Sequence, residues 1–329
     1  MTTVAHDVTV RPFAATDRPS VLGLLAASLG WSSDERHAEY FAWKHEQSPF
    51  GASPAWVAVD RDGELLGFRT FLRWEFMRGT HVVRAVRAVD TATRPDIQRR
   101  GIFTRLTMTA VEALIRDDVE FVFNTPNPRS LPGYVQMGWQ RVGQLPVRVR
   151  PASVRRLARL VQARGPAEKW SLPTEAGAPA VDAFANVEPV ERLLAAVRNT
   201  TDLRTRLSVD YLRWRYGFLP LRYRVLSVGP TVADGMVVFR LRRRRRAIEA
   251  VICDVLVPSD DAKSSTHLCR QVVAVTGADY ALRAGRSSSA GGFVPLPGQG
   301  PILTWRALTD PTMPSRREWD LSVGDVELF

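Results

Sequence analysis

The spacing of apolar residues changes within residues 86–115, and this change predicts a strand followed by a helix. Residues 86–93 (VRAVDTAT) are typical of a β-strand, which ends before Pro95. From residue 102 onward, apolar side chains recur every three or four positions, as on the buried face of an amphipathic helix: Ile102, Leu106, Ala110, Ala113 and Leu114. The two elements are joined by a basic turn that contains glycine, residues 98–101.

This turn has the chemistry of an anion-binding site. A helix N-terminus presents backbone N–H groups without intrahelical acceptors, together with the positive end of the helix dipole. Gly101 lets the backbone approach a ligand closely, and Arg99 and Arg100 add positive charge. The sequence therefore predicts a pyrophosphate cradle here.

A second strand and a short helix are predicted immediately downstream. Residues 120–124 (EFVFN) form an apolar run of strand length. Asn127 is then suited to cap a short helix with Pro128 at its first position. We expect that helix to carry Tyr134 and to end at Gly138, before another strand begins.

The two segments resemble the cofactor motifs of the GNAT superfamily of acyl-CoA-dependent N-acetyltransferases. The first is similar to [Q/R]-x-x-G-x-[G/A], although Phe103 replaces the usual small residue. The second is similar to N-x-x-[A/S]-x-x-x-Y-x-x-x-G-[F/W], with Asn127, Ser130, Tyr134, Gly138 and Trp139 at the motif positions. The resemblance is close over residues 86–143 and loose over the rest of the first half.

The resemblance implies acetyl-CoA as a co-substrate and no metal. The implied cofactor-binding residues are Thr91, Ala92, Thr93, Gln98, Arg99, Arg100, Gly101, Ile102, Phe103 and Asn127. An exposed N–H of the strand at residues 91–93 would polarise the thioester carbonyl, as an oxyanion hole does. Tyr134 is the candidate general acid, because a phenol stays protonated at neutral pH and can donate to sulfur. We expect Phe103 to pack into the helix–sheet core and Pro132 to bend the short helix.

The sequence leaves the general base open. Asp90 lies on the correct strand, but alternation does not decide which way its side chain points. Tandem family members that acetylate aminoglycosides can use their terminal carboxylate, which makes Phe329 a second candidate. The remaining carboxylates and imidazoles of the first half carry no distinguishing signal: Glu46, Glu64, Glu75, His45 and His81.

An internal repeat relates the two halves of the chain. Tyr40-Phe41-Ala42-Trp43-Lys44-His45 is matched by Tyr211-Leu212-Arg213-Trp214-Arg215-Tyr216, an offset of 171 residues (211 − 40). Phe68-Arg69 is matched by Phe239-Arg240 at the same offset. After a slip in register, Ala88-Val89-Asp90 corresponds to Ile252-Cys253-Asp254, and Gly138-Trp139 to Gly292-Phe293. Several matches in one order predict two copies of one fold.

The second copy lacks the features of an anion site. Residues 259–271 (SDDAKSSTHLCRQ) contain no glycine, and Asp260 and Asp261 stand where a phosphate would bind. We therefore expect an α/β protein of two tandem GNAT-like domains, each a mixed, mostly antiparallel sheet flanked by helices, with a degenerate second copy. The expected ranges are 1–150 for the acetyl-CoA-binding domain, 151–187 for a linker with a short basic helix, and 188–329 for the second domain.

Composition adds a partner hypothesis. The net charge is +11, with runs at residues 242–246 and at Arg155, Arg156, Arg159 and Arg164. Such charge suits nucleic acid, but we favour a solvated hairpin tip and a solvated helix face. Cys253 and Cys269 each lie in apolar stretches and are expected to pack in the core. With no apolar run of about eighteen residues, we expect no membrane contact and a cytoplasmic enzyme.

Three functions fit these features. The leading one is acetyl transfer to a small or peptidyl amine by direct attack in a ternary complex. The alternatives are an aminoacyl-tRNA-dependent peptidyl transferase and a catalytically idle regulator that binds CoA or nucleic acid. The acceptor and the oligomeric state have no signature in the sequence.

Overall fold

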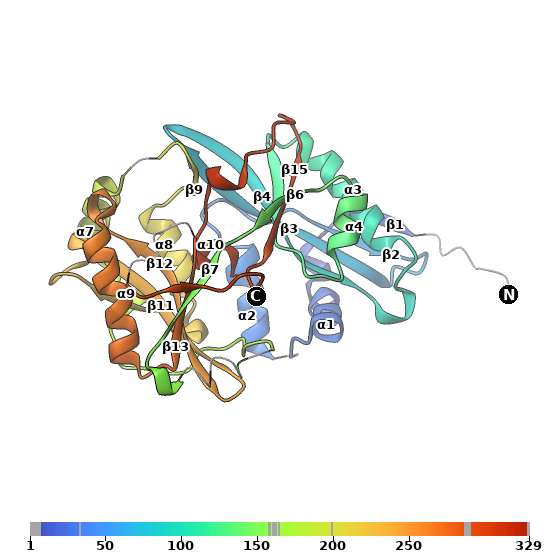
Figure 1. The fold of residues 1–329 in the computed structure, drawn as a ribbon. Coiled ribbons are helices and arrows are strands. Elements are labelled where there is room, and N and C mark those ends of the chain that lie inside the picture. Colours follow the sequence, from blue (N-terminus) through green and yellow to red (C-terminus); the bar gives the residue numbers. More distant parts are fainter. Residues whose placement is uncertain are drawn as a thin grey trace. The chain divides into compact units, whose positions relative to one another are not determined.

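A computed structural model describes residues 8–32, 34–156, 159, 163, 165–198, 200–285 and 291–327. The chain folds into two compact α/β units, each a sheet flanked by helices (Figure 1). The first unit contains Met1–Phe76, Val82–Gly143 and Leu303–Pro314, and the second contains Met77–His81, Gln144–Ile302 and Ser315–Phe329. The predicted fold class is confirmed.

The sheet of the first unit has the strand order β1-β2-β3-β4-β5-β15-β6. The β4–β5 pair is parallel, whereas β1–β2, β2–β3 and β5–β15 are antiparallel. Its elements are β1 (Thr9–Pro12), α1 (Arg18–Leu29), α2 (Glu35–His45), β2 (Ala55–Val59), β3 (Leu65–Arg78), β4 (His81–Thr93), α3 (Ile102–Ile115), β5 (Phe121–Asn124), α4 (Leu131–Gln136), β6 (Gln140–Gln144) and β15 (Ile302–Ala307).

Helix α3 covers this sheet with the face that the sequence predicts. Ile102, Leu106, Ala110 and Leu114 are all buried in one apolar cluster. The helix lies close to β3 at Gly67, where a Cβ atom would be only 2.9 Å from Cγ2 of Ile102. Close packing at this position fixes the start of α3 against the sheet, and the start of α3 is the predicted anion site.

The second unit repeats this plan with its own sheet, in the order β14-β7-β13-β12-β11-β10-β8. Its elements are β7 (Val147–Pro151), β8 (Ala178–Pro179), α6 (Ala180–Ala183), α7 (Val187–Ala196), β9 (Leu203–Thr205), α8 (Val209–Gly217), β10 (Arg224–Ser227), β11 (Met236–Arg244), β12 (Ala247–Leu256), α9 (Ala262–Thr276), β13 (Tyr280–Ala284), β14 (Val294–Pro295), β16 (Trp319–Asp320) and α10 (Val323–Val326). The repeated segments of the sequence form corresponding elements, α2 with α8, β3 with β11, and β4 with β12.

Each sheet includes strand pairing with a segment from the other half of the sequence. Strand β15 lies between β5 and β6 in the first sheet, and β7 pairs with β13 in the second (Figure 1). The backbone N–H of Leu145 donates to the carbonyl of Pro301 at 2.9 Å, so the chain leaves the first sheet beside the point where it returns. The continuous ranges expected from the sequence place β15 outside the first domain, because strand pairing over such a distance has no local signal.

The expected linker and basic runs form part of the second unit. Leu172 pairs with Leu241 of β11, and Arg156 and Arg159 pair with the buried carboxylate of Asp279. The run at residues 242–246 is only partly the solvated tip that we expected, since Arg242 and Arg244 both form ion pairs with the buried Glu249. Arg164 lies outside the described residues.

Both cysteines are buried and free, as predicted for core residues. Burial raises the pKa of the Cys253 thiol to about 12, so this thiol is not a nucleophile at neutral pH. Among the helices that the structure describes, none is long and apolar enough to cross a bilayer.

Because β15 lies between β5 and β6, its position predicts how fragments of the first half of the chain behave. Residues 1–150 alone should aggregate or melt without a cooperative transition, because they lack the buried Leu303 and Trp305 and leave the edge of β5 unpaired. Circular dichroism melting measures this.

The contact between Leu145 and Pro301 supplies the control. A fragment of residues 1–145 joined through Asn-Gly to residues 301–314 restores β15 as a hairpin and should melt cooperatively. Cooperative melting of residues 1–150 on their own would contradict the dependence on β15.

Candidate active site

Strand β4 pairs with β5 over only part of its length and then continues toward the basic turn at residues 98–101. Their parallel pairing covers Ala85–Phe121 to Arg87–Phe123, whereas β4 continues to Thr93. At Asp90 the backbone has φ of 41°, a left-handed conformation that is uncommon for residues other than glycine. Residues 91–93 thus lie beyond the part of β4 that pairs with β5.

A buried ion pair holds this bend in β4. The carboxylate of Asp90 accepts from Nζ of Lys44 at 2.7 Å and from Nε2 of His45 at 2.8 Å. All three side chains are buried, and Nδ1 of His45 lies 3.1 Å from the hydroxyl of Ser53.

The same contacts make Asp90 a poor base. Burial raises the pKa of Asp90, but the Lys44 ammonium and the hydrogen bond from His45 outweigh burial and hold that pKa well below its usual range. Burial lowers the pKa of His45 more than Asp90 raises it, so the imidazole is neutral at pH 7. The geometry favours a positioning role for Asp90 over the general base expected from the sequence.

The turn before α3 is open to an anion. Arg99 and Gly101 have φ of 64° and 78°, so the backbone curls tightly into the helix. No side chain caps α3, and a Cβ atom at Gly101 would meet nothing within 4 Å. Gln98, Arg99, Arg100 and Gly101 are exposed, whereas Ile102 is buried. Free amides, positive charge and open space suit a pyrophosphate.

In the second unit, the N-terminus of the corresponding helix, α9, is capped by a side chain. The carboxylate of Asp261 accepts from the backbone N–H groups of Lys263 and Ser264 at 3.0 and 3.1 Å, so it occupies the amides that would bind a phosphate. A cavity of about 670 Å³ opens beside β12 and is lined by Asp254, Asp260 and Asp325. Arg198, Arg204 and Arg283 line the same cavity, so its lining carries both signs of charge.

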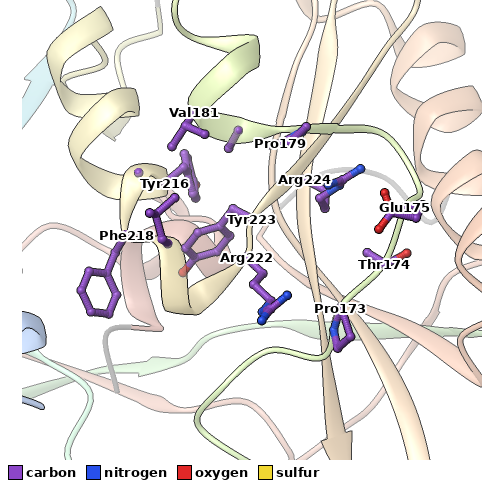
Figure 2. A pocket seen from close by; sticks show the side chains of 13 residues that line it. Pro173, Thr174, Glu175, Pro179, Val181, Tyr216, Phe218, Arg222, Tyr223 and Arg224 are labelled. Atoms are coloured by element: carbon purple, nitrogen blue, oxygen red, sulfur yellow. The ribbon is translucent and has the colours of Figure 1, made fainter. Parts of the chain in front are cut away.

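A second pocket of the same unit is too small for a nucleotide. Figure 2 shows Tyr216, Phe218 and Tyr223 on one side of this pocket and Glu175 and Arg224 on the other. Its volume is about 180 Å³, below the range of about 300–1,000 Å³ that is usual for ligand sites.

Tyr134 lies in α4 beside a buried arginine. Its ring packs edge-on against Phe103 at 5.4 Å and against Trp139 at 5.2 Å. Its hydroxyl oxygen accepts a hydrogen bond of 2.8 Å from Nη1 of Arg69, which also donates to Oγ1 of Thr91. Arg69 therefore connects the candidate acid to the strand that is expected to bind the thioester.

Sequence analysis missed Arg69. A charged residue within the apolar run LLGFRTFL of β3, repeated as Arg240 in the second copy, was the signal available. Both arginines are fully buried.

The short helix differs in detail from the prediction. Helix α4 begins at Leu131 and not at Pro128, with Pro132 in its first turn, where proline does not bend a helix. The Asn127 side chain accepts from the N–H groups of Arg129 and Ser130 at 3.0 and 2.9 Å and orders the turn before the helix. Phe103 packs against the main core, as expected. Phe329 lies outside the described residues.

The end of the β4–β5 pairing, the uncapped N-terminus of α3 and the buried Tyr134 all belong to the first α/β unit. Residues 9–142 match the family described as acetyltransferase (GNAT) domain. No curated protein matches the sequence.

Solved structures with this fold cover most of the chain. A GCN5-related N-acetyltransferase from Kribbella flavida is 14% identical with a TM-score of 0.60, over 92% of this chain and 72% of that one. A GCN5-related N-acetyltransferase from Anabaena variabilis is 12% identical with a TM-score of 0.61, over 92% and 73%. Eis1 from Mycobacterium abscessus is 16% identical with a TM-score of 0.57, also over 92% and 73%. At these identities the similarity concerns the fold.

The contrast between α3 and α9 predicts one acetyl-CoA per chain. Calorimetry of the full chain should give a single site, which Gly101→Glu weakens at least about tenfold by placing a carboxylate on the free amides. Gly101→Asn tolerates the left-handed backbone and is the control for strain. Two equivalent sites, or unchanged binding by Gly101→Glu, would contradict this prediction.

The Asp90 ion pair predicts a pH-dependent stability. Asp90→Asn removes the carboxylate that pairs with the buried Lys44 and should cost about 3–5 kcal/mol at pH 7. Because the pKa of Asp90 is depressed, its contribution is complete above the ordinary carboxyl value of about 4 and is lost as the pH falls through the folded-state value. Urea unfolding at several pH values should therefore show the difference from wild type shrinking only below about pH 4.

The matched control is an exposed ion pair. Asp117→Asn breaks the surface pair with Arg73 and should cost at most about 1 kcal/mol at any of these pH values. An Asp90→Asn cost as small as this would mean that the buried pair does not hold the bend.

Proposed function

We propose that this protein is an N-acetyltransferase that moves an acetyl group from acetyl-CoA to a primary amine by direct attack in a ternary complex. The uncapped turn at residues 98–103 carries the proposal, because it follows the unpaired end of β4 and lies within the residues that match the acetyltransferase (GNAT) domain. An aminoacyl-tRNA-dependent transferase would have no use for such a turn.

Two segments would bind different parts of acetyl-CoA. Acetyl-CoA supplies the thioester carbon that the amine attacks. The amides after Gly101 and the charges of Arg99 and Arg100 would bind its pyrophosphate. The backbone of Thr91, Ala92 and Thr93 would bind its pantetheine arm and polarise the carbonyl.

Proton transfer is assigned to Tyr134 on the leaving-group side. Its phenol can donate to the departing sulfur and spare the release of a free thiolate. On the amine side, the general base stays open, since Asp90 is committed to Lys44 and His45. The acceptor class stays open among small and peptidyl amines.

A thiol-release assay with acetyl-CoA and a panel of amines tests the function directly. Antibiotics, polyamines, amino sugars and lysine peptides each represent one acceptor class. Release of CoA that depends on the amine, with equal formation of the N-acetyl product by mass spectrometry, would support the proposal. Binding of acetyl-CoA without transfer to any amine would instead favour an idle binding protein.

Replacing Tyr134 separates its chemistry from its packing. Tyr134→Phe keeps the ring contacts with Phe103 and Trp139 and removes the proton donor, so acetyl-CoA affinity should be retained while turnover falls about 10²–10⁴-fold. Tyr280→Phe in the second unit removes a buried hydroxyl that donates to Glu249 and should leave turnover unchanged. Wild-type turnover by Tyr134→Phe would make Tyr134 a packing residue.

A further inference from the structure

Arg69 is a fully buried cation without a buried anion beside it. Its exposed fraction is 0%, and its guanidinium carbon lies 4.4 Å from the ring centre of Phe71, 5.4 Å from that of Tyr134 and 5.7 Å from that of Phe103. Aromatic faces offset part of the desolvation cost of a cation. Within the described part of the chain, no carboxylate forms an ion pair with Arg69.

Its hydrogen bonds are also incomplete. Nη1 donates to the hydroxyls of Tyr134 and Thr91, whereas Nε and Nη2 have no partner among the described residues. A buried guanidinium in this state is unfavourable for folding. It is, however, arranged in advance to stabilise negative charge that forms next to it.

The hydrogen bond from Arg69 determines how Tyr134 can act. The phenol oxygen accepts from Nη1, so its own proton is directed elsewhere, and no described residue accepts that proton. The phenol is thus held as a donor. When it gives the proton away, the resulting phenolate lies 2.8 Å from a buried positive charge.

We infer that Arg69 is a positioning residue that aims the Tyr134 proton at the leaving sulfur and stabilises the phenolate that remains. The inference rests on the proposed function. In the step, the amine nitrogen bonds to the acyl carbon while the C–S bond breaks and its electron pair goes to sulfur. Sulfur takes the proton of Tyr134, and the phenolate recovers, through solvent, the proton that the amine nitrogen loses.

The second copy provides a matched control. Arg240 occupies the corresponding position and is equally buried, but it donates to the carbonyl of Lys169 at 3.0 Å and lies 3.5 Å from the carboxylate of Glu327. Its charge is compensated by the protein, as expected of a structural arginine.

Arg69→Met and Arg240→Met should therefore differ in melting temperature and in turnover. Arg69→Met removes an uncompensated cation, so melting should be unchanged or higher, while turnover falls about 10²–10³-fold at unchanged acetyl-CoA affinity. Arg69→Lys should recover part of the turnover, because it retains the charge. Arg240→Met should lower melting and leave the turnover of the folded protein unchanged.

A double-mutant cycle tests whether Arg69 acts through Tyr134. Adding Arg69→Met to Tyr134→Phe should cost less than about threefold further, whereas independent residues would multiply their losses. Full multiplication, or lower melting of Arg69→Met with wild-type turnover, would overturn the inference. A wild-type chain that acetylates no amine would refute the proposed function, and the melting comparison would still decide whether Arg69 is a structural residue.

Discussion

The ion pair between Lys44 and Asp90 is the contact on which the active site depends. It lies in the apolar interior of the first unit, where breaking it would leave a charge without compensation. That cost holds Asp90 in a left-handed conformation at the point where β4 leaves β5. The end of the β4–β5 pairing, the backbone of residues 91–93 and the turn into α3 all lie within a few residues of this bend.

The second unit has residues at the positions that correspond to Lys44, His45 and Asp90, but these residues form different contacts. Arg215 corresponds to Lys44 and is equally buried, but it donates to the backbone carbonyls of Gly324 and Glu327 and to Tyr223. Tyr216, the counterpart of His45, donates to Asp254. Burial and the neighbouring Asp325 raise the pKa of Asp254 to about 7, the opposite direction from Asp90.

The strand irregularity nevertheless persists in this second copy. Cys253 is bulged out of register between β11 and β12, directly before Asp254. The second copy thus has a bulge in place of the left-handed residue at Asp90, and the counterpart of Lys44 donates to the carbonyl of Gly324 in α10. Asp261 caps the start of α9, so the second unit also lacks the open anion site of α3.

Local features of the site could be predicted from the sequence, and contacts between distant segments could not. The strand, the basic turn and the amphipathic face of α3 lie within thirty consecutive residues and share one set of spacing rules. Strand β15 comes from a segment more than 170 residues after β5, so no periodicity indicates its partner. Helix α4 begins later than predicted because Asn127 caps a turn, and an Asn-Pro pair favours a turn as readily as a helix start.

The buried cations show why function and stability separate in this protein. Lys44 is balanced by Asp90 and Arg240 by Glu327, so each lowers the energy of one fixed conformation. Arg69 has only neutral hydroxyls and aromatic rings around it, which leaves its charge available to a group that becomes negative during a reaction. Such a residue lowers the stability of the folded state, so we expect it to be retained only where it contributes to a reaction. The free amides of α3 have the same character, since they too lack a partner within the protein. Both features belong to the first unit; in the second unit, the Glu327 carboxylate lies 3.5 Å from Arg240, and Asp261 accepts from backbone N–H groups at the start of α9.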